Sequence, residues 1–159
     1  MTLQIDDAFI KNWEPQYDEE SIGGDYKDYG TLVRAVAGEM NIMGTISKKT
    51  FLEIWKWKGA MRVIRHVRLA KYENLYAEAF RRAASEPPER KLAQLVGAEA
   101  KLPGVGTPTG STIIHSIHPD SMAIIDIRTV ETLFEARRIS TKQRDLEHYE
   151  EFRKAINRM

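Results

Sequence analysis

The sequence predicts an all-α fold, and two observations carry this prediction. Apolar residues recur every three or four positions through most of the 159 residues, which is the spacing of one helix face. Glycine and proline gather in short stretches between these periodic segments, where helices end and begin. Only residues 121–127 fit an extended segment, and this stretch is short. The length and the 42% apolar content fit a single soluble globular domain with its own core.

The first half of the chain contains three predicted helices. Residues 32–40 carry an apolar stripe, and a helix over residues 47–58 starts at Ser47, whose hydroxyl suits the N-cap position. A longer amphipathic pattern covers residues 63–85. Two prolines follow it and mark a break, because proline inside a helix removes a backbone donor and clashes with the preceding turn.

The second half continues the helical pattern. Pro88 suits the first turn of a helix over residues 88–100, and Thr107 with Pro108 predicts the N-cap and the first position of the next helix. A further helix follows Asp126, and residues 140–159 predict a last amphipathic helix with a serine or threonine start.

The net charge of +1 hides an uneven distribution. Residues 1–30 carry eight acids and two lysines, a balance of −6, so the rest of the chain carries +7. Residues 48–71, here called the basic stripe, contain one acidic residue, Glu53. Their lysines and arginines are Lys48, Lys49, Lys56, Lys58, Arg62, Arg65, Arg68 and Lys71. Clustered lysine and arginine can neutralise phosphates, although a solvated helix face has the same composition.

Composition excludes several function classes. The chain has no cysteine, which rules out disulfides, thiolate catalysis and cysteine-ligated clusters. No stretch approaches the ~20 apolar residues of a membrane span, and the amino terminus does not resemble a signal peptide. We therefore expect no membrane partner and a cytoplasmic location, at the nucleoid if the protein binds DNA.

The stretch KLPGVGTPTG, residues 101–110, lies between two predicted helices and contains glycines that leave its backbone accessible. Gly104 and Gly106 allow a positive φ or the close approach of another group, while Leu102 and Val105 are placed to pack between the helices. Amides that point outward ahead of a helix amino terminus form an anion site, for which DNA phosphate is a candidate. A plain connection between two helices is the alternative interpretation.

Residues 102–106 resemble the hairpin of the helix-hairpin-helix DNA glycosylases, the superfamily that contains the endonuclease III and adenine glycosylase enzymes. The segment AIIDIRTVETL resembles the part of that family in which an apolar pair precedes an aspartate. Here the aspartate is Asp126, twenty residues after Gly106, and this separation also fits the family pattern. The resemblance covers about residues 88–133.

The resemblance implies base-excision DNA repair on double-stranded DNA. Asp126 would face an extrahelical base and oppose the positive charge that develops on the deoxyribose as the N-glycosidic bond breaks. An aspartate at this place also suits the N-cap of the next helix, and both roles stay open. The hairpin would grip the DNA backbone, with a possible monovalent cation at its main chain, through Lys101, Leu102, Gly104, Val105, Gly106, Thr107 and Thr109.

Departures from the family narrow this expectation. Pro108 stands where bifunctional members have the lysine that forms a Schiff base, so we expect a monofunctional enzyme without lyase activity. Arg128 replaces a histidine that often follows the aspartate, and it is placed to pair with Asp126 or to reach a phosphate. We expect no cofactor and no iron-sulfur cluster.

Other candidates follow from side-chain chemistry. Trp57, Lys58 and Arg62 are possible accessory DNA contacts, because Trp57 lies between two lysines and aromatic rings stack on bases. His115 and His118 have the H-x-x-H spacing of a helix, but two histidines without a clear third ligand do not predict a metal site.

These expectations combine into one domain over residues 1–159 with two helical lobes. Residues from about 30 to 120, including the hairpin 102–106, would form the central lobe. Residues from about 1 to 25 with residues 127–159 would form the second, and the site would lie between them near Asp126. The leading hypothesis is a monofunctional DNA N-glycosylase that excises a damaged or mispaired base. The alternatives are a non-catalytic helix-hairpin-helix DNA-binding module and a helical protein-interaction domain with an unknown protein partner.

Overall fold

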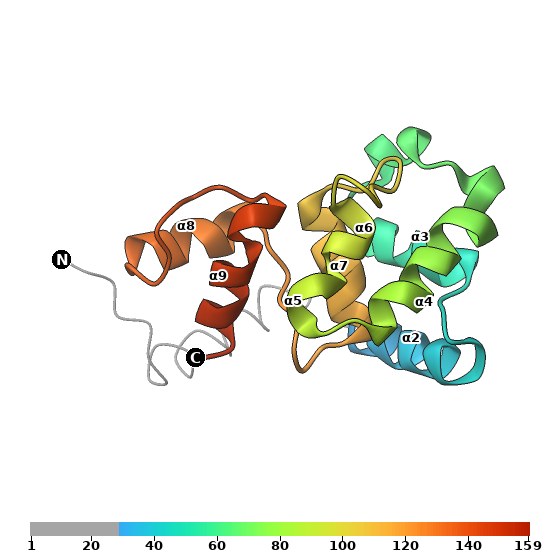
Figure 1. The fold of residues 1–159 in the computed structure, drawn as a ribbon, viewed down its shortest axis with the longest axis horizontal. Helices are drawn as coiled ribbons and strands as arrows, with labels where there is room; N and C mark the ends of the chain where they lie inside the picture. Colours follow the sequence, from blue (N-terminus) through green and yellow to red (C-terminus); the bar gives the residue numbers. More distant parts are fainter. Residues whose placement is uncertain (1–28) are drawn as a thin grey trace.

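The computed structural model describes residues 29–159, and this part of the chain is all helical, as predicted, with no strand. Figure 1 shows the helices packed in two groups along the long axis, with α8 and α9 beside the remaining ones. The elements are α2 (Tyr29–Met43), α3 (Lys48–Trp57), the 3₁₀ helices η2 (Met61–His66) and η3 (Leu69–Lys71), the π-helical η4 (Glu73–Ala77), α4 (Glu78–Ser85), α5 (Pro88–Lys91), α6 (Ala93–Val96), α7 (Thr107–Ile117), α8 (Ile127–Glu135) and α9 (Leu146–Ile156).

The predicted N-cap at Ser47 is confirmed. Its hydroxyl accepts a hydrogen bond from the Thr50 amide at 3.2 Å, which satisfies one of the free donors at the start of α3. The Glu39 carboxylate of α2 in turn accepts from the Ser47 amide at 2.6 Å and from the Thr50 hydroxyl at 2.7 Å. The start of α3 is therefore joined to α2 through side chains.

Two predicted helices are broken in the structure. Residues 63–85 divide into η2, η3, η4 and α4, and Val67 between η2 and η3 has an extended backbone. Residues 88–100 divide into α5 and α6, and Gly97 with its extended ψ of 155° ends the second. Apolar spacing reports which side chains are buried, but it does not reveal where a neighbouring segment interrupts the helix.

One cluster of buried hydrophobic side chains runs through the described residues. In its centre the Phe51 ring lies 5.3 Å from the ring of Tyr76 and 5.8 Å from that of Trp55, measured between centroids. Helix α7 packs against α2, α3 and α6, while Leu133 of α8 and Phe152 of α9 extend the same cluster. The division into two lobes stays a prediction, and the amino-terminal residues assigned to the second lobe lie outside the described residues.

Candidate functional site

The hairpin of residues 102–106 joins α6 to α7. Leu102 and Val105 are buried, with 4% and 2% of their surfaces exposed, so their predicted packing is confirmed. Gly104 has a φ of +79°, the left-handed conformation that side chains other than glycine rarely adopt. Gly106 has a φ of −100°, and a Cβ there would have no neighbour closer than 3.9 Å. Gly106 therefore has neither a positive φ nor a close neighbour among the described residues, and the approach of a group from outside the chain stays a prediction for it.

The amino end of α7 differs from the prediction by one residue. Gly106 is the N-cap, because its backbone is extended and its carbonyl accepts from the Gly110 amide at 2.8 Å. Thr107 is already the first helical residue, so its predicted capping role is wrong, and no side chain caps the helix. Within residues 29–159 no hydrogen bond engages the amides of Gly104 and Gly106. The hairpin thus presents free donors at the positive end of a helix dipole.

The hairpin packs against the carboxyl-terminal half of the basic stripe. A Cβ on Gly104 would lie 2.8 Å from the carbonyl carbon of His66 and 2.9 Å from the nitrogen of Val67, so only glycine permits this approach. Tyr76 joins the same two segments, since its hydroxyl donates to the Pro103 carbonyl at 2.6 Å and accepts from the backbone amide of Arg68 at 2.9 Å. In Figure 1 the turn before α7 lies beside the segment that follows α3. The exposed cations of this segment are Arg62, Arg65, Arg68 and Lys71.

The rest of the basic stripe lies elsewhere. Lys49 and Lys56 line a groove of about 390 Å³ between α2 and α3, together with Trp57 at one end. Lys58 follows α3 and is half-buried. The stripe therefore spans two environments, the groove beside α3 and the segment whose residues 66–68 contact the hairpin and Tyr76.

Asp126 is the N-cap of α8. Its carboxylate accepts from the Thr129 amide at 3.0 Å and from the Thr129 hydroxyl at 3.1 Å, so the capping alternative describes what the side chain does here. Arg128 is exposed, and no ion pair within the described chain joins it to Asp126. Of the two roles expected for Arg128, the pairing with Asp126 is absent in residues 29–159, and contact with a phosphate stays a prediction. Asp126 itself is half-buried at the start of α8.

Lys58 and Asp126, 68 positions apart in the sequence, lie within electrostatic range of each other. Burial lowers the pKa of the Lys58 ammonium, the Asp126 carboxylate opposes this shift, and Arg144 adds to it. The charges of one predicted accessory residue and the predicted catalytic residue therefore interact, and no ion pair between the two is present among the described residues. The signal in the sequence was only that Lys58 belongs to the basic stripe.

Trp57 belongs to an aromatic contact at the junction of α2, α3 and α7. Its ring stacks on Tyr29 with centroids 4.2 Å apart, and the Tyr29 hydroxyl is hydrogen-bonded to Nδ1 of His115 at 2.5 Å. Burial raises the pKa of Tyr29 and lowers the pKa of His115, with Asp120 opposing the second shift. Both side chains are therefore neutral at pH 7. The sequence does not single out Tyr29, because 86 residues separate it from His115.

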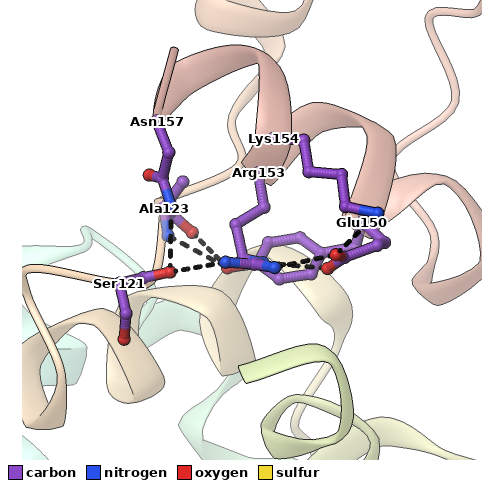
Figure 2. Close-up of polar contacts among 7 residues, drawn as sticks. Ser121, Ala123, Glu150, Arg153, Lys154 and Asn157 are labelled. Carbon is purple, nitrogen blue, oxygen red and sulfur yellow. Dashed lines mark hydrogen bonds and ion pairs between the residues drawn. The ribbon is translucent and has the colours of Figure 1, made fainter. Parts of the chain in front are cut away.

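Side chains from α7 and from the α9 region hold the segment 121–125, which leads to Asp126. The Tyr149 hydroxyl donates to the Ala123 carbonyl at 2.6 Å and accepts from the Ala123 amide at 3.1 Å. Arg153 donates to the Ser121 carbonyl at 3.0 Å while its other nitrogens bind Glu150, as Figure 2 shows. From the opposite helix, α7, the Ser111 hydroxyl accepts from the amide of residue 125 at 3.1 Å. Nothing in the sequence marked these residues.

The described residues contain no group of three or more His, Cys, Asp or Glu side chains placed to hold a metal ion. In the hairpin, the carbonyls of Leu102, Pro103 and Gly106 each accept a hydrogen bond from the chain. A monovalent cation at the hairpin stays a prediction. Between residues 29 and 159, no helix has the length and apolar character needed to cross a membrane.

Comparisons of the chain with protein-family models, with curated proteins and with solved structures found no match.

Proposed function

We propose that this protein is a DNA N-glycosylase that binds the backbone of double-stranded DNA through the hairpin and excises a damaged or mispaired base through Asp126. One observation carries the proposal: the hairpin, in which the amides of Gly104 and Gly106 are free, packs on the backbone of His66 and Val67, within the segment that carries the exposed cations of residues 62–71. Backbone amides and arginines are the groups that bind phosphate oxygens without reading sequence. Such a protein acts in base-excision repair and is located with the DNA.

The chemistry assigned to Asp126 is hydrolysis. The bond between the deoxyribose C1′ and the base nitrogen breaks, a water oxygen bonds to C1′, and the base leaves with a proton. A carboxylate stabilises the positive charge that develops on the sugar, and this effect is larger where water is excluded. Pro108 has no amine, so this route forms no Schiff base at that position and the enzyme is monofunctional.

DNA binding is tested with charge variants of the full chain. Replacing Arg62 and Arg65 with glutamine removes two exposed cations near the hairpin, and we expect weaker binding to any duplex. Each lost phosphate contact lowers the slope of log K against log salt by about 1. Arg81→Gln is the matched control, since Arg81 is exposed on α4 and pairs with Glu78. Equal affinities for all these variants contradict the proposed surface.

Catalysis is tested on labelled duplexes that contain uracil, oxidised purine, alkylated purine or a mismatch, followed by alkali to reveal abasic sites. Asp126→Asn retains a capping oxygen but removes the charge, so we expect excision to be lost and DNA affinity to remain. Asp145→Asn is the matched control, because Asp145 caps α9 through the His148 amide in the same way. Excision by Asp126→Asn at the wild-type rate excludes the catalytic role.

A second candidate function is a DNA-binding module without chemistry. The observation that favours it is that both acceptors of the Asp126 carboxylate are engaged by Thr129. This candidate predicts salt-sensitive duplex binding with no abasic product on any substrate of the panel. A verified, Asp126-dependent excision product rules it out.

A further inference from the structure

A single buried hydroxyl connects the first turn of α7, which follows the hairpin, to the residue before Asp126. Ser111 is fully buried in α7, and its Oγ donates to the carbonyl of Pro108, in the first turn after the hairpin, at 2.8 Å. The same Oγ accepts from the Ile125 amide at 3.1 Å, one residue before Asp126. Ile125 is also fully buried, so no water replaces this bond when the hydroxyl is removed.

The other side of the segment is held from α9. The Tyr149 hydroxyl is hydrogen-bonded to both the amide and the carbonyl of Ala123. Arg153 and Asn157 both donate to the Ser121 carbonyl, at 3.0 and 3.2 Å (Figure 2). The Glu150 carboxylate holds the Arg153 guanidinium at 2.7 Å. The segment is therefore hydrogen-bonded to α7 on one side and to α9 on the other, although none of its residues is in a helix or strand.

We propose that Ser111 and Tyr149 are positioning residues, which hold Asp126 at a constant place relative to the hairpin. The inference rests on the proposed function, in which the hairpin binds the DNA backbone and Asp126 acts on the sugar. A reaction of this kind depends on the distance between the binding group and the reacting group, and a shift of about 1 Å can lower a rate by two orders of magnitude. Ser111 transmits the position of α7 to residue 125, while Tyr149 prevents the segment from moving toward solvent.

The experiment compares Ser111→Ala and Tyr149→Phe with Ser116→Ala in the full chain. Ser116 is a matched control: it lies in the same helix, is equally buried, and its hydroxyl donates only to the Ile113 carbonyl at 2.7 Å. Two readouts are taken, namely single-turnover base release with duplex Kd, and amide hydrogen exchange at Ile125 and Thr129. The Thr129 amide reports on Asp126 because it donates to the Asp126 carboxylate.

For Ser111→Ala and Tyr149→Phe we expect base release to slow by about tenfold or more, with Kd changed by less than about twofold. Exchange at Thr129 should accelerate by about tenfold in both variants but not in Ser116→Ala. Equal exchange acceleration in Ser116→Ala overturns the inference, since the loss of any buried hydroxyl then loosens the site. Wild-type exchange at Thr129 in Ser111→Ala also overturns it.

The failure of the proposed function has a different signature. If the wild-type chain releases no base from any duplex, the glycosylase proposal fails, and the exchange comparison alone decides whether Ser111 and Tyr149 hold Asp126. If the wild-type chain releases base and Ser111→Ala does so at the same rate with the same Kd, catalysis stands and the positioning inference is wrong.

Discussion

The hairpin 102–106 and the segment 121–126 are the two candidate functional regions, and they are stabilised differently. In the hairpin, Leu102 and Val105 enter the core and Gly104 packs directly on the backbone of Val67, while Tyr76 adds a hydrogen bond to the Pro103 carbonyl. The segment 121–126 depends on side chains from α7 and α9. We expect a single substitution to disrupt a region whose shape depends on its own backbone conformation. A region held by several side chains from other helices should instead lose stability stepwise as these side chains are removed.

This difference also concerns function. The hairpin leaves the amides of Gly104 and Gly106 free, and its proposed role in DNA binding requires a rigid conformation. The segment delivers a single carboxylate, and that carboxylate is itself engaged as a helix cap. Four predictions test the contrast, from the largest expected effect to the smallest.

The largest effect is expected at Gly104. Gly104→Ala places a side chain at a φ of +79° and a Cβ 2.8 Å from the His66 carbonyl carbon, so we expect a loss of ~3 kcal/mol in the free energy of unfolding. Gly106→Ala, two residues away, meets neither obstacle and should cost only about 0.5–1 kcal/mol, because alanine is a poorer N-cap of α7 than glycine. Urea denaturation measures both. Similar losses for the two variants contradict the local origin of the hairpin conformation.

The second prediction concerns Tyr149. Tyr149→Phe removes a hydroxyl that bonds both the amide and the carbonyl of Ala123, and leaving buried groups unpaired costs ~2 kcal/mol. Tyr72→Phe removes one buried bond, to the Ile46 carbonyl at 2.7 Å, and should cost about half as much. Urea denaturation of the two variants compares them directly. A larger loss in the free energy of unfolding for Tyr72→Phe shows that the second hydrogen bond of Tyr149 does not add to stability.

The third prediction separates the two roles of Asp126. Asp126→Ala removes the cap of α8 and should lower the free energy of unfolding by ~1 kcal/mol, whereas Asn at this position should cost only a few tenths. Thermal unfolding of both variants gives the comparison. If Asp126→Asn is as destabilising as Asp126→Ala, a loss of excision in the asparagine variant can no longer be attributed to the missing charge alone.

The smallest effect is expected when the pH is lowered, and it concerns hydrogen exchange of the backbone at the start of the segment 121–126. Burial lowers the pKa of His118, with Lys91 adding to the shift, and the His118 carbonyl accepts from the amides of Ser121 and Met122. The unfolded chain binds this proton more readily, so the stability contribution is present above the ordinary value of 6.5 and is lost as the pH falls. Hydrogen exchange should therefore accelerate at Met122 between pH 7 and 5, after correction for intrinsic rates, with no change at Val105.

His148 has the opposite sign and serves as the comparison. Its hydrogen bond with Asp145 raises its pKa, so its contribution is complete at low pH and is lost as the pH rises through the raised value. His118→Gln should abolish the acid effect at Met122, and His148→Gln should leave it unchanged. Acid acceleration that persists in His118→Gln assigns the effect to another group.

Where local rules apply, the sequence determined the result. The all-α class, the Ser47 cap and the burial of Leu102 and Val105 follow from periodicity and capping chemistry, which act between neighbours in the chain. At Gly104 the sequence predicted a positive φ or a close approach, and the structure has both. The one-residue error at Thr107 has the same origin, because threonine and glycine both suit an N-cap and only the observed backbone separates them.

Tertiary structure alone decided how the candidate site is assembled. Lys58 near Asp126, Tyr29 bonded to His115 and Ser111 bonded to residue 125 join positions that are distant in the sequence. The interruption of residues 63–85 also arises there, because Val67 extends where the hairpin packs on it. Such contacts depend on the relative placement of helices, which is fixed by the packing of the whole core and not by any residue's immediate neighbours.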